Sequence, residues 1–215
     1  MSAFRAVAFD FNGTLSHDEP ILYAIYRDLF SEHGRPLTES DYFGTLAGLT
    51  EETIISTWLG VDGEELAVLV EERIERYLVR NEHGDTISPE TREAVAYAAA
   101  RVPVAVVSGA FRREIEPVLA AAGLDRQVDL LVAADDVERG KPDPEGYLRA
   151  ISSLDGGLLA HEVVAFEDTQ AGVAAATTAG VYCVALLGTH PAERLRAADE
   201  LVEVIDVALV RRLLG

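Results

Sequence analysis

Cysteine and long apolar runs are nearly absent from this chain. The single cysteine, Cys183, lies within the apolar run Val181–Leu187 and is expected to be a buried strand residue, not a disulfide partner, metal ligand or nucleophile. This cysteine usage is typical of the cytoplasm, where we expect the protein to reside. No apolar run approaches the roughly 20 residues of a membrane-spanning helix. The first apolar run, Ala6–Phe9, is also too short for a signal peptide.

Basic side chains are scarce as well. The 215 residues include 18 Lys and Arg against 37 Asp and Glu, which gives a formal net charge of −19. Nucleic acids and anionic membranes bind through basic surface, so neither is expected as a partner. With 49% hydrophobic residues, the chain is long enough for one sizeable core and a smaller module. We expect a monomer or a small homo-oligomer.

An aspartate directly follows the first apolar run. Ala6–Phe9 is short, partly β-favouring and followed by turn residues, which predicts a buried parallel strand that ends at Asp10. Ligands of open α/β sheets bind outside the carboxyl ends of the strands. Asp10 is therefore a candidate nucleophile, with Asn12 two residues later. Taken alone, an aspartate at this place is equally consistent with a loop residue or a helix cap.

Two further positions offer groups that bind an anion. The run Val104–Val107 ends at Ser108, whose hydroxyl, together with the first amides of a helix expected over 110–122, suits an oxyanion. The alternative is that Ser108 only caps that helix. Lys141 is the only lysine in the chain and lies in a loop that two prolines stiffen. A lysine is a compact point charge, and its presence in this loop indicates that a site there requires such a charge. An exposed surface lysine is the simpler alternative.

Two carboxylates, Glu167 and Asp168, follow the run Val163–Phe166. Adjacent carboxylates suit Mg²⁺, a hard cation that prefers oxygen ligands, although Asp168 can equally cap the helix expected over 169–179. We thus assign an Asp, a Ser, a Lys and a Glu-Asp pair to four successive strand ends. Because the carboxyl ends of parallel strands share one edge of a sheet, these groups are expected to converge on one site.

These motifs resemble those of the haloacid dehalogenase superfamily of aspartate-nucleophile phosphohydrolases, in particular the subgroup of β-phosphoglucomutase and phosphoglycolate phosphatase. The matching segments are Asp10-Phe11-Asn12-Gly13-Thr14, Ser108-Gly109, Gly140-Lys141-Pro142-Asp143 and Glu167-Asp168-Thr169 with Gly172. Their order and spacing span nearly the whole chain. The resemblance implies a Rossmann-like three-layer α/β core with a parallel sheet and an inserted all-helical cap domain. It also implies an Mg²⁺-dependent phosphatase that acts on a small phosphorylated metabolite through an aspartyl-phosphate.

The resemblance further implies a role for each matching residue. Asp10 would attack phosphorus, while Ser108 and Lys141 would hold the phosphoryl oxygens. The expected metal-binding residues are Asp10, Asn12 through its backbone carbonyl, Asp168 and Glu167. The expected substrate-binding residues are Gly13, Thr14, Ser108, Gly109, Lys141 and Arg112. For Arg112, which follows Ser108 closely, an exposed position on the helix is the alternative.

Asn12 departs from the family pattern, which has an aspartate at this position. An amide keeps the backbone carbonyl but cannot protonate a leaving group or activate water, help that is typically worth ~10²–10⁴ in rate. We hypothesise a slow phosphatase, or one limited to good leaving groups such as aryl and acyl phosphates. The alternative is a catalytically weakened relative that binds a phosphorylated ligand. Asn12-Gly13 is also prone to deamidation, and Asn12 as an engineered replacement remains a further alternative.

Between residues 16 and 86 the pattern becomes helical only. Apolar residues recur at helical spacing over 21–30 and 66–78, and polar, turn-rich breaks occur at 16–20 and 81–88. We predict a core of residues 1–15 and 87–215 and a mobile α-helical cap of residues 16–86 that excludes water and selects substrate. Glu51 stands where β-phosphoglucomutase carries a phosphate-binding arginine, which counts against a mutase that clamps a second phosphate.

Overall fold

The structure, a computed structural model, describes residues 4–154 and 157–215. Its centre is a sheet of six strands in the order β3-β2-β1-β4-β5-β6, in which every neighbouring pair is parallel. The strands are β1 (Ala6–Phe9), β2 (Val104–Val107), β3 (Leu130–Val132), β4 (Val163–Glu167), β5 (Tyr182–Leu186) and β6 (Glu200–Val202). The expected Rossmann-like parallel sheet is thereby confirmed.

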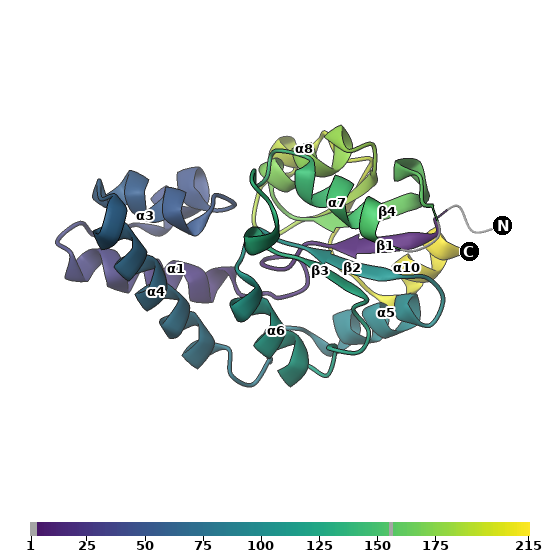
Figure 1. The fold of residues 1–215 in the computed structure, drawn as a ribbon, viewed down its shortest axis with the longest axis horizontal. Helices are drawn as coiled ribbons and strands as arrows, with labels where there is room; N and C mark the ends of the chain where they lie inside the picture. Colours follow the sequence, from purple (N-terminus) through teal and green to yellow (C-terminus); the bar gives the residue numbers. More distant parts are fainter. Residues whose placement is uncertain (1–3, 155–156) are drawn as a thin grey trace.

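Helices cover both faces of the sheet (Figure 1). One face is covered by α7 (Glu145–Ser153) and α8 (Gln170–Thr178), and the other by α5 (Pro89–Ala99), α6 (Arg112–Ala121) and α10 (Val207–Leu214). The short helix α9 (Ala192–Leu195) follows β5, and single 3₁₀ turns, Ala134–Asp136 and Ala160–Glu162, precede α7 and β4. These helices and the sheet form the three layers that the sequence predicts.

A separate group of helices lies beyond the end of the sheet (Figure 1). We call it the helical lobe; it comprises α1 (Glu19–Glu32), α2 (Glu39–Asp41), a π-helical turn (Tyr42–Leu46), α3 (Glu51–Leu59) and α4 (Gly63–Arg80). Its helices α1 and α3 pack on α4, and α4 also contacts α6 of the core. The lobe begins within the polar break predicted at 16–20 and ends directly before the one predicted at 81–88.

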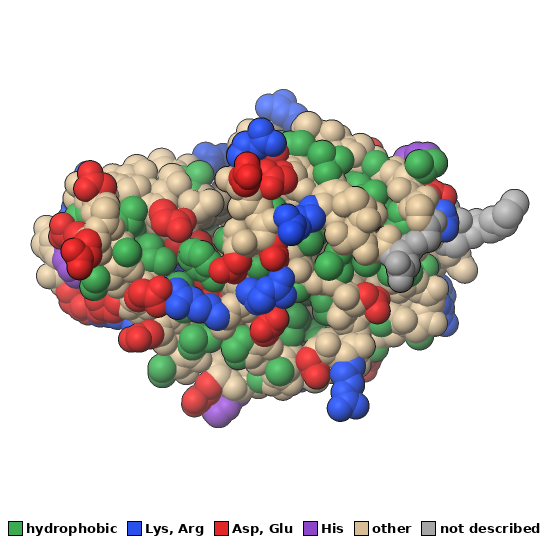
Figure 2. Space-filling model, in the orientation of Figure 1, with side chains coloured by type: hydrophobic (Ala, Val, Ile, Leu, Met, Phe, Trp, Pro, Cys, Tyr) green, Lys and Arg blue, Asp and Glu red, His purple; other side chains and the backbone are tan. Residues whose placement is uncertain are grey.

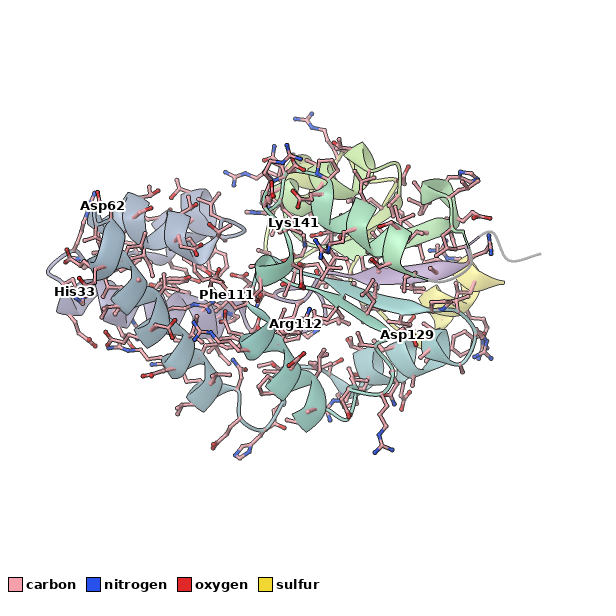
Figure 3. The ribbon with its side chains drawn as sticks, viewed as in Figure 1. His33, Asp62, Phe111, Arg112, Asp129 and Lys141 are labelled. Atoms are coloured by element: carbon pink, nitrogen blue, oxygen red, sulfur yellow. The ribbon has the colours of Figure 1, made fainter. Side chains whose placement is uncertain are left out.

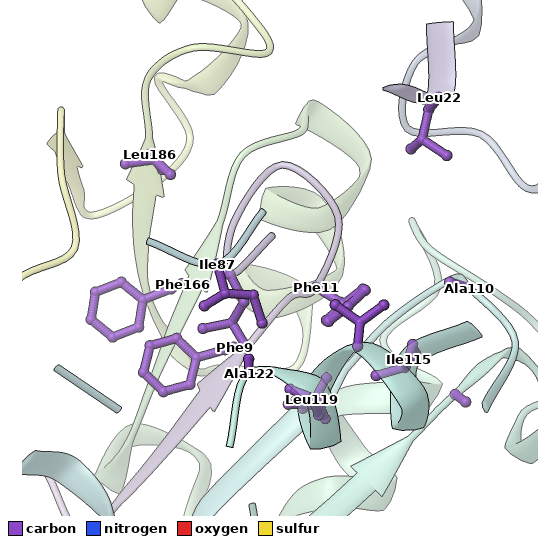
Figure 4. Packing of buried hydrophobic residues seen from close by; sticks show 14 of the residues in the cluster. Phe9, Phe11, Leu22, Ile87, Ala110, Ile115, Leu119, Ala122, Phe166 and Leu186 are labelled. Carbon is purple, nitrogen blue, oxygen red and sulfur yellow. The ribbon is translucent and has the colours of Figure 1, made fainter. Parts of the chain in front are cut away.

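The strands are buried on both faces because each face carries its own apolar cluster. Val7 and Phe9 of β1 point into the cluster with α5, α6 and α10, where Phe9 stacks on Phe166 at 4.9 Å between ring centroids (Figure 4). Ala6 and Ala8 point the other way, into the cluster beneath α7 and α8. Continuous apolar runs are what such doubly covered parallel strands require. Small alanines on the second face let α7 and α8 approach closely.

Helix starts follow the capping chemistry of the sequence. Ser88 accepts a hydrogen bond from the Thr91 N–H at 3.1 Å and is followed by Pro89, the first residue of α5. Thr169 accepts from the Gly172 N–H at 3.0 Å and so caps α8. The cap of α8 is therefore Thr169 and not Asp168, which removes the alternative role considered for that carboxylate.

Two features of the sheet differ from the sequence prediction. The edge strands β3 and β6 are only three residues long and are not among the predicted strands, although β3 lies within the apolar residues 130–134. Lys141 does not lie at a strand end, because a 3₁₀ turn and a loop separate it from β3. The prediction of four strand ends is therefore wrong for Lys141, and that residue reaches the sheet edge by its loop.

The surface carries acidic side chains over both the helical lobe and the core, as Figure 2 shows for one face. Arginines are interspersed among them, and several form ion pairs there, such as Arg76 with Glu32 at 2.6 Å. Across residues 4–154 and 157–215, no helix combines the length and the apolar character needed to cross a bilayer.

Candidate active site

The carboxyl ends of the three central strands bring Asp10, Ser108 and Glu167 to one edge. Phe9 of β1 is in register with Val106 of β2 and with Phe166 of β4. The backbone N–H of Asp10 donates to the Phe166 carbonyl at 2.9 Å and continues the ladder beyond β1. Because register fixes the three strand ends relative to one another, the side chains that follow them converge as expected.

Lys141 approaches this edge from the loop before α7 and lies on the side that faces the helical lobe (Figure 3). Its Nζ is 2.5 Å from Asp10 Oδ1 and 2.7 Å from Glu167 Oε1. The Tyr147 hydroxyl donates to the same Glu167 oxygen at 2.5 Å. Burial opposes the charge on Lys141, but the two carboxylates outweigh it and raise the pKa of Lys141 above its ordinary value. Lys141 is therefore a fixed ammonium beside Asp10, not an exposed surface lysine.

Asp10, Glu167 and Asp168 form a buried cluster of carboxylates. One oxygen from each lies within 4.8 Å of the others. Asp168 Oδ2 and Glu167 Oε2 have no hydrogen-bond partner among residues 4–154 and 157–215. Burial, together with the negative charges of Asp10 and Glu19, raises the pKa of Asp168 well above its ordinary value. Crowded carboxylate oxygens with unused lone pairs fit a hard divalent cation such as Mg²⁺.

Gly13 and Thr14 support this cluster from behind. Gly13 has a φ of +74°, and a Cβ there would lie 1.9 Å from Asp168 Oδ2, so that only glycine fits. The Thr14 hydroxyl donates to Asp168 Oδ1 at 3.3 Å. The two residues, predicted from the motif as substrate contacts, thus position Asp168, and neither lies in the wall of the cavity beside Asp10.

The side chain of Asn12 faces a buried carboxylate, Asp18. Asn12 Nδ2 donates to Asp18 Oδ2 at 2.9 Å, and the Tyr77 hydroxyl donates to the same oxygen at 2.5 Å. The Gly13 N–H donates to Asp18 Oδ1 at 3.3 Å. Burial raises the pKa of Asp18 in spite of these donors. The sequence analysis did not single out Asp18; its place just after the motif was the available signal.

A cavity lies between this edge and the helical lobe. On the core side its wall includes Asp10, Asn12, Ser108, Gly109, Lys141 and Thr169. Ser108 is buried and accepts a hydrogen bond from the Ala110 N–H at 3.1 Å, so that its hydroxyl proton is free to donate to an anion. The alternative role of Ser108, as the cap of the following helix, is wrong, because α6 begins at Arg112 with Phe111 as its N-cap, whereas Ser108 lies beside Asp10 in the cavity wall.

The lobe side of the cavity is polar, and of its residues only Glu51 was singled out from the sequence. Tyr42 donates to Glu19 Oε2 at 3.0 Å, and burial with the neighbouring Asp18 raises the pKa of Glu19 to about 7. Arg73 is almost fully buried, is paired with Glu114, and has its second terminal nitrogen 3.4 Å from Glu51 Oε1. These residues lie on amphipathic helices, where the sequence alone does not distinguish a cavity-facing charge from a solvated one.

Arg112, at the start of α6 (Figure 3), is directed elsewhere. Its terminal nitrogens lie 2.6 Å from Asp136 and 3.2 Å from Glu116, and one donates to the Leu131 carbonyl at 3.0 Å. Arg112 does not belong to the wall of the cavity beside Asp10. We therefore leave it out of the phosphate site proposed below.

Comparison with known proteins shows which family has this fold and this arrangement of residues. The family model of haloacid dehalogenase-like hydrolases matches residues 4–180. The validoxylamine A 7′-phosphate phosphatase of Streptomyces hygroscopicus is 32% identical over 213 residues, 97% of this chain and 96% of that protein. The phosphorylated carbohydrates phosphatase of Thermotoga maritima is 30% identical over 186 residues, 82% of each chain. A crystal structure of CbbY from Rhodobacter sphaeroides in complex with xylulose-1,5-bisphosphate has 25% identity and a TM-score of 0.83, covering 95% of each chain.

The chain thus belongs to the haloacid dehalogenase-like hydrolase family, as the motifs at the strand ends predict. Within this family it is an enzyme of the phosphatase class, which acts on phosphorylated compounds. The subgroup suggested by the motifs is confirmed by relatives named as phosphoglycolate phosphatases, such as that of Pectobacterium atrosepticum at 29% identity.

Proposed function

We propose that the protein is an Mg²⁺-dependent phosphomonoesterase that transfers the phosphoryl group of a small phosphorylated polyol to Asp10 and then to water. The observation that carries this proposal is the position of Lys141 Nζ, 2.5 Å from Asp10 Oδ1, at the edge of the sheet where Asp168 and Ser108 also lie. Relatives that act on validoxylamine A 7′-phosphate and on phosphorylated carbohydrates support a polyol as the body of the substrate.

Each of these residues has its own role in the proposed phosphoryl transfer. Asp10 supplies the attacking carboxylate oxygen, and Lys141 and the Ser108 hydroxyl hold phosphoryl oxygens against it. Asp10, Asp168 and the Asn12 carbonyl would hold Mg²⁺, with Glu167 supporting from beside it. When bound, the cation would offset the negative charge that accumulates on the phosphoryl group. Glu167 has a second task in this chain, because it fixes Lys141 through the contact at 2.7 Å.

Asn12 sets the range of substrates in this proposal. Its amide donates to Asp18 and has no proton to give to a leaving group at neutral pH. Leaving groups that depart as stable anions, such as phenolates, need no such proton. We therefore propose that turnover is slow for alkyl phosphates and substantially faster for aryl phosphates.

Release of inorganic phosphate tests the proposal. We expect Mg²⁺-dependent hydrolysis of p-nitrophenyl phosphate that EDTA abolishes, with a rate on glycerol phosphate lower by about 10²-fold or more, the order of general-acid help. Asp10→Asn should abolish turnover, and Lys141→Met should reduce it by several orders of magnitude. Equal and fast rates on the aryl and alkyl phosphates would contradict the role assigned to Asn12.

A second function is favoured by one observation, the engagement of the Asn12 amide by Asp18 at 2.9 Å. A site in which Asp18 holds the Asn12 amide in this way can bind a phosphorylated ligand without hydrolysing it. In that case, neither the natural chain nor Asn12→Asp would release phosphate, while the ligand would still raise the unfolding temperature. The intact Asp10 and Lys141 favour the phosphatase, because binding alone does not need a nucleophile.

We further propose that residues 16–86, which contain the helical lobe, act as a mobile cap. The cavity is walled by the core on one side and by α1, α3 and α4 on the other, so that separation of the two would open it. A contact that would break on opening is the hydrogen bond from Arg194 to the Gly44 carbonyl at 3.2 Å. Protection of the lobe from hydrogen exchange should rise when phosphate and Mg²⁺ are added together.

A further inference from the structure

The lobe side of the cavity contains polar atoms without partners. Glu51 Oε2, the Tyr26 hydroxyl and Arg73 Nε are buried and have no hydrogen-bond partner among residues 4–154 and 157–215. All three side chains belong to the cavity wall, and none is more than 6% exposed. A buried polar group left unpaired carries a penalty that a ligand can relieve. These atoms are therefore a ready-made set of hydrogen-bond positions for the body of a substrate.

The charge of this wall is negative. Glu19 and Glu51 face the cavity, and Arg73 is the cation among them. Arg73 is already paired with Glu114 behind the wall, and the rings of Tyr26 and Tyr77 lie 5.5 and 5.3 Å from its guanidinium carbon. The wall and the side chains behind it thus contain three carboxylates, Glu19, Glu51 and Glu114, and one guanidinium. A net negative charge remains after Arg73 is paired.

A second anionic group on the substrate would meet, at this wall, only a cation that Glu114 and Glu51 already pair, Arg73. Lys141 is committed to Asp10 and Glu167 at the other side of the cavity, where the phosphate binds. A carboxylate or a second phosphate would instead lie against Glu19 and Glu51, and like charges within a buried site repel strongly. Hydroxyl groups and a protonated amine, in contrast, are donors that these acceptor oxygens can bind.

We propose that the body of the substrate is an amino polyol, with a protonated amine that Glu19 and Glu51 bind and hydroxyl groups that meet Tyr26 and Glu51. This inference rests on the proposed phosphatase function and names its substrate class. Burial raises the pKa of Glu19 to about 7 and raises that of Glu51, against the opposing effect of Arg73. A cationic ligand favours the charged form of both carboxyls, which strengthens its own binding.

Matched sugar phosphates test this class. Glucosamine 6-phosphate and glucose 6-phosphate differ in one amine, N-acetylglucosamine 6-phosphate lacks its charge, and 6-phosphogluconate adds a carboxylate. Because a hydrogen bond to a charged group contributes about 1.5–3 kcal/mol, we expect the amino compound to have a kcat/KM at least about tenfold higher, mainly through KM. Glu51→Gln and Glu19→Gln should each reduce this preference, whereas Glu52→Gln, at an exposed neighbouring position, should leave it unchanged.

Binding is measured in parallel, so that the substrate class is tested apart from turnover. Asp10→Asn protein should be stabilised against thermal unfolding more by glucosamine 6-phosphate than by glucose 6-phosphate, and least by 6-phosphogluconate. Equal effects of the first two compounds, or the strongest effect from 6-phosphogluconate, would overturn the amino-polyol assignment. Hydrolysis of p-nitrophenyl phosphate by the natural chain reports on the phosphatase function itself, so that failure there leaves the binding comparison to decide the substrate class.

Discussion

Asn12→Asp, which introduces the aspartate that the motif resemblance implies at this position, should destabilise this protein in a pH-dependent way. Asn12 Nδ2 lies 2.9 Å from Oδ2 of the fully buried Asp18, and Asn12 itself is partly buried. An aspartate at position 12 would place two carboxylate oxygens at that distance. Both cannot be ionised so close together, so the folded protein must retain one proton between them.

The size of the loss in unfolding free energy follows from the proton that the folded variant retains. In the unfolded chain both aspartates titrate near 3.9, so at pH 7 both are ionised. The folded variant then binds one more proton than the unfolded chain, and its stability falls as the pH rises. Holding a proton about 3 pH units above the ordinary pKa costs about 4 kcal/mol at pH 7, and about 1.5 kcal/mol at pH 5. In the natural chain the Asn12 amide donates to Asp18 and lowers its pKa, so that only burial opposes the ionisation of Asp18.

Urea unfolding in metal-free buffer at pH 5 and pH 7 measures this difference. The control is the exchanged pair Asn12→Asp with Asp18→Asn, in which an amide again faces a carboxylate and the net charge is unchanged. We expect the exchanged pair to recover most of the lost stability and to hydrolyse glycerol phosphate faster than the natural chain. If Asn12→Asp alone is as stable as the natural chain at both pH values, then Asp18 does not hold Asn12 as described.

The remaining predictions concern stability and the shape of the site. Arg73→Met should cost about 3–5 kcal/mol in urea unfolding because it leaves Glu114 and Glu51 buried without their cation, whereas Arg76→Met, on the exposed side of α4, should cost less than about 1 kcal/mol; similar losses would refute the buried pairing. Gly13→Ala should abolish Mg²⁺-dependent turnover because its Cβ would lie 1.9 Å from Asp168 Oδ2, while Gly34→Ala, with the same φ of +74° and open space, should lose only about 1–2 kcal/mol of stability and remain active. Glu19→Gln should gain thermal stability relative to the natural chain as the pH rises from 4.5 to 7, by up to about 3 kcal/mol, because burial raises the pKa of Glu19 to about 7, so that over this range the unfolded natural chain gives up the Glu19 proton while the folded chain keeps it; a pH-independent difference would contradict this.

The core of the site could be predicted from the sequence because its parts lie at the ends of unambiguous strands. The runs Val104–Val107 and Ala6–Phe9 match their strands residue for residue, and parallel pairing then fixes Asp10 next to Glu167. Lys141 was identified because it is the only lysine in the chain, although it reaches the site from a loop and not from a strand end. The edge strand β6 was missed because Glu200-Leu201-Val202 leaves no apolar run, whereas β3 was missed although residues 130–134 are all apolar.

On the lobe side of the cavity, the sequence does not predict which polar residues face the cavity. Glu19, Glu51 and Arg73 lie on helices whose patterns fix which residues are apolar, but not which polar residues face a partner across space. Arg73 is the clearest case, since an arginine within the acidic, charged segment of α4 is expected in solvent and is instead 1% exposed. Its burial depends on Glu114 from α6, 41 residues away in sequence, which only the tertiary fold brings near.

The pairing of Asn12 with Asp18 also explains why an amide is tolerated at position 12. In a buried turn that already holds Asp18, an aspartate at position 12 would create a second negative charge at hydrogen-bond distance, beside the carboxylates of Asp10 and Asp168. The amide donates to Asp18 and keeps the backbone carbonyl free, so the turn is stabilised while the general acid is lost. Since the Tyr77 hydroxyl donates to the same Asp18 oxygen at 2.5 Å, removal of that donor in Tyr77→Phe should weaken the hold on Asn12 without placing any new charge in the site. We expect a loss of about 1 kcal/mol or more in urea unfolding that grows as the pH rises, because the Tyr77 hydroxyl lowers the pKa of Asp18 and its removal favours the protonated carboxyl; a Tyr77→Phe variant as stable as the natural chain at every pH would contradict this role of Tyr77.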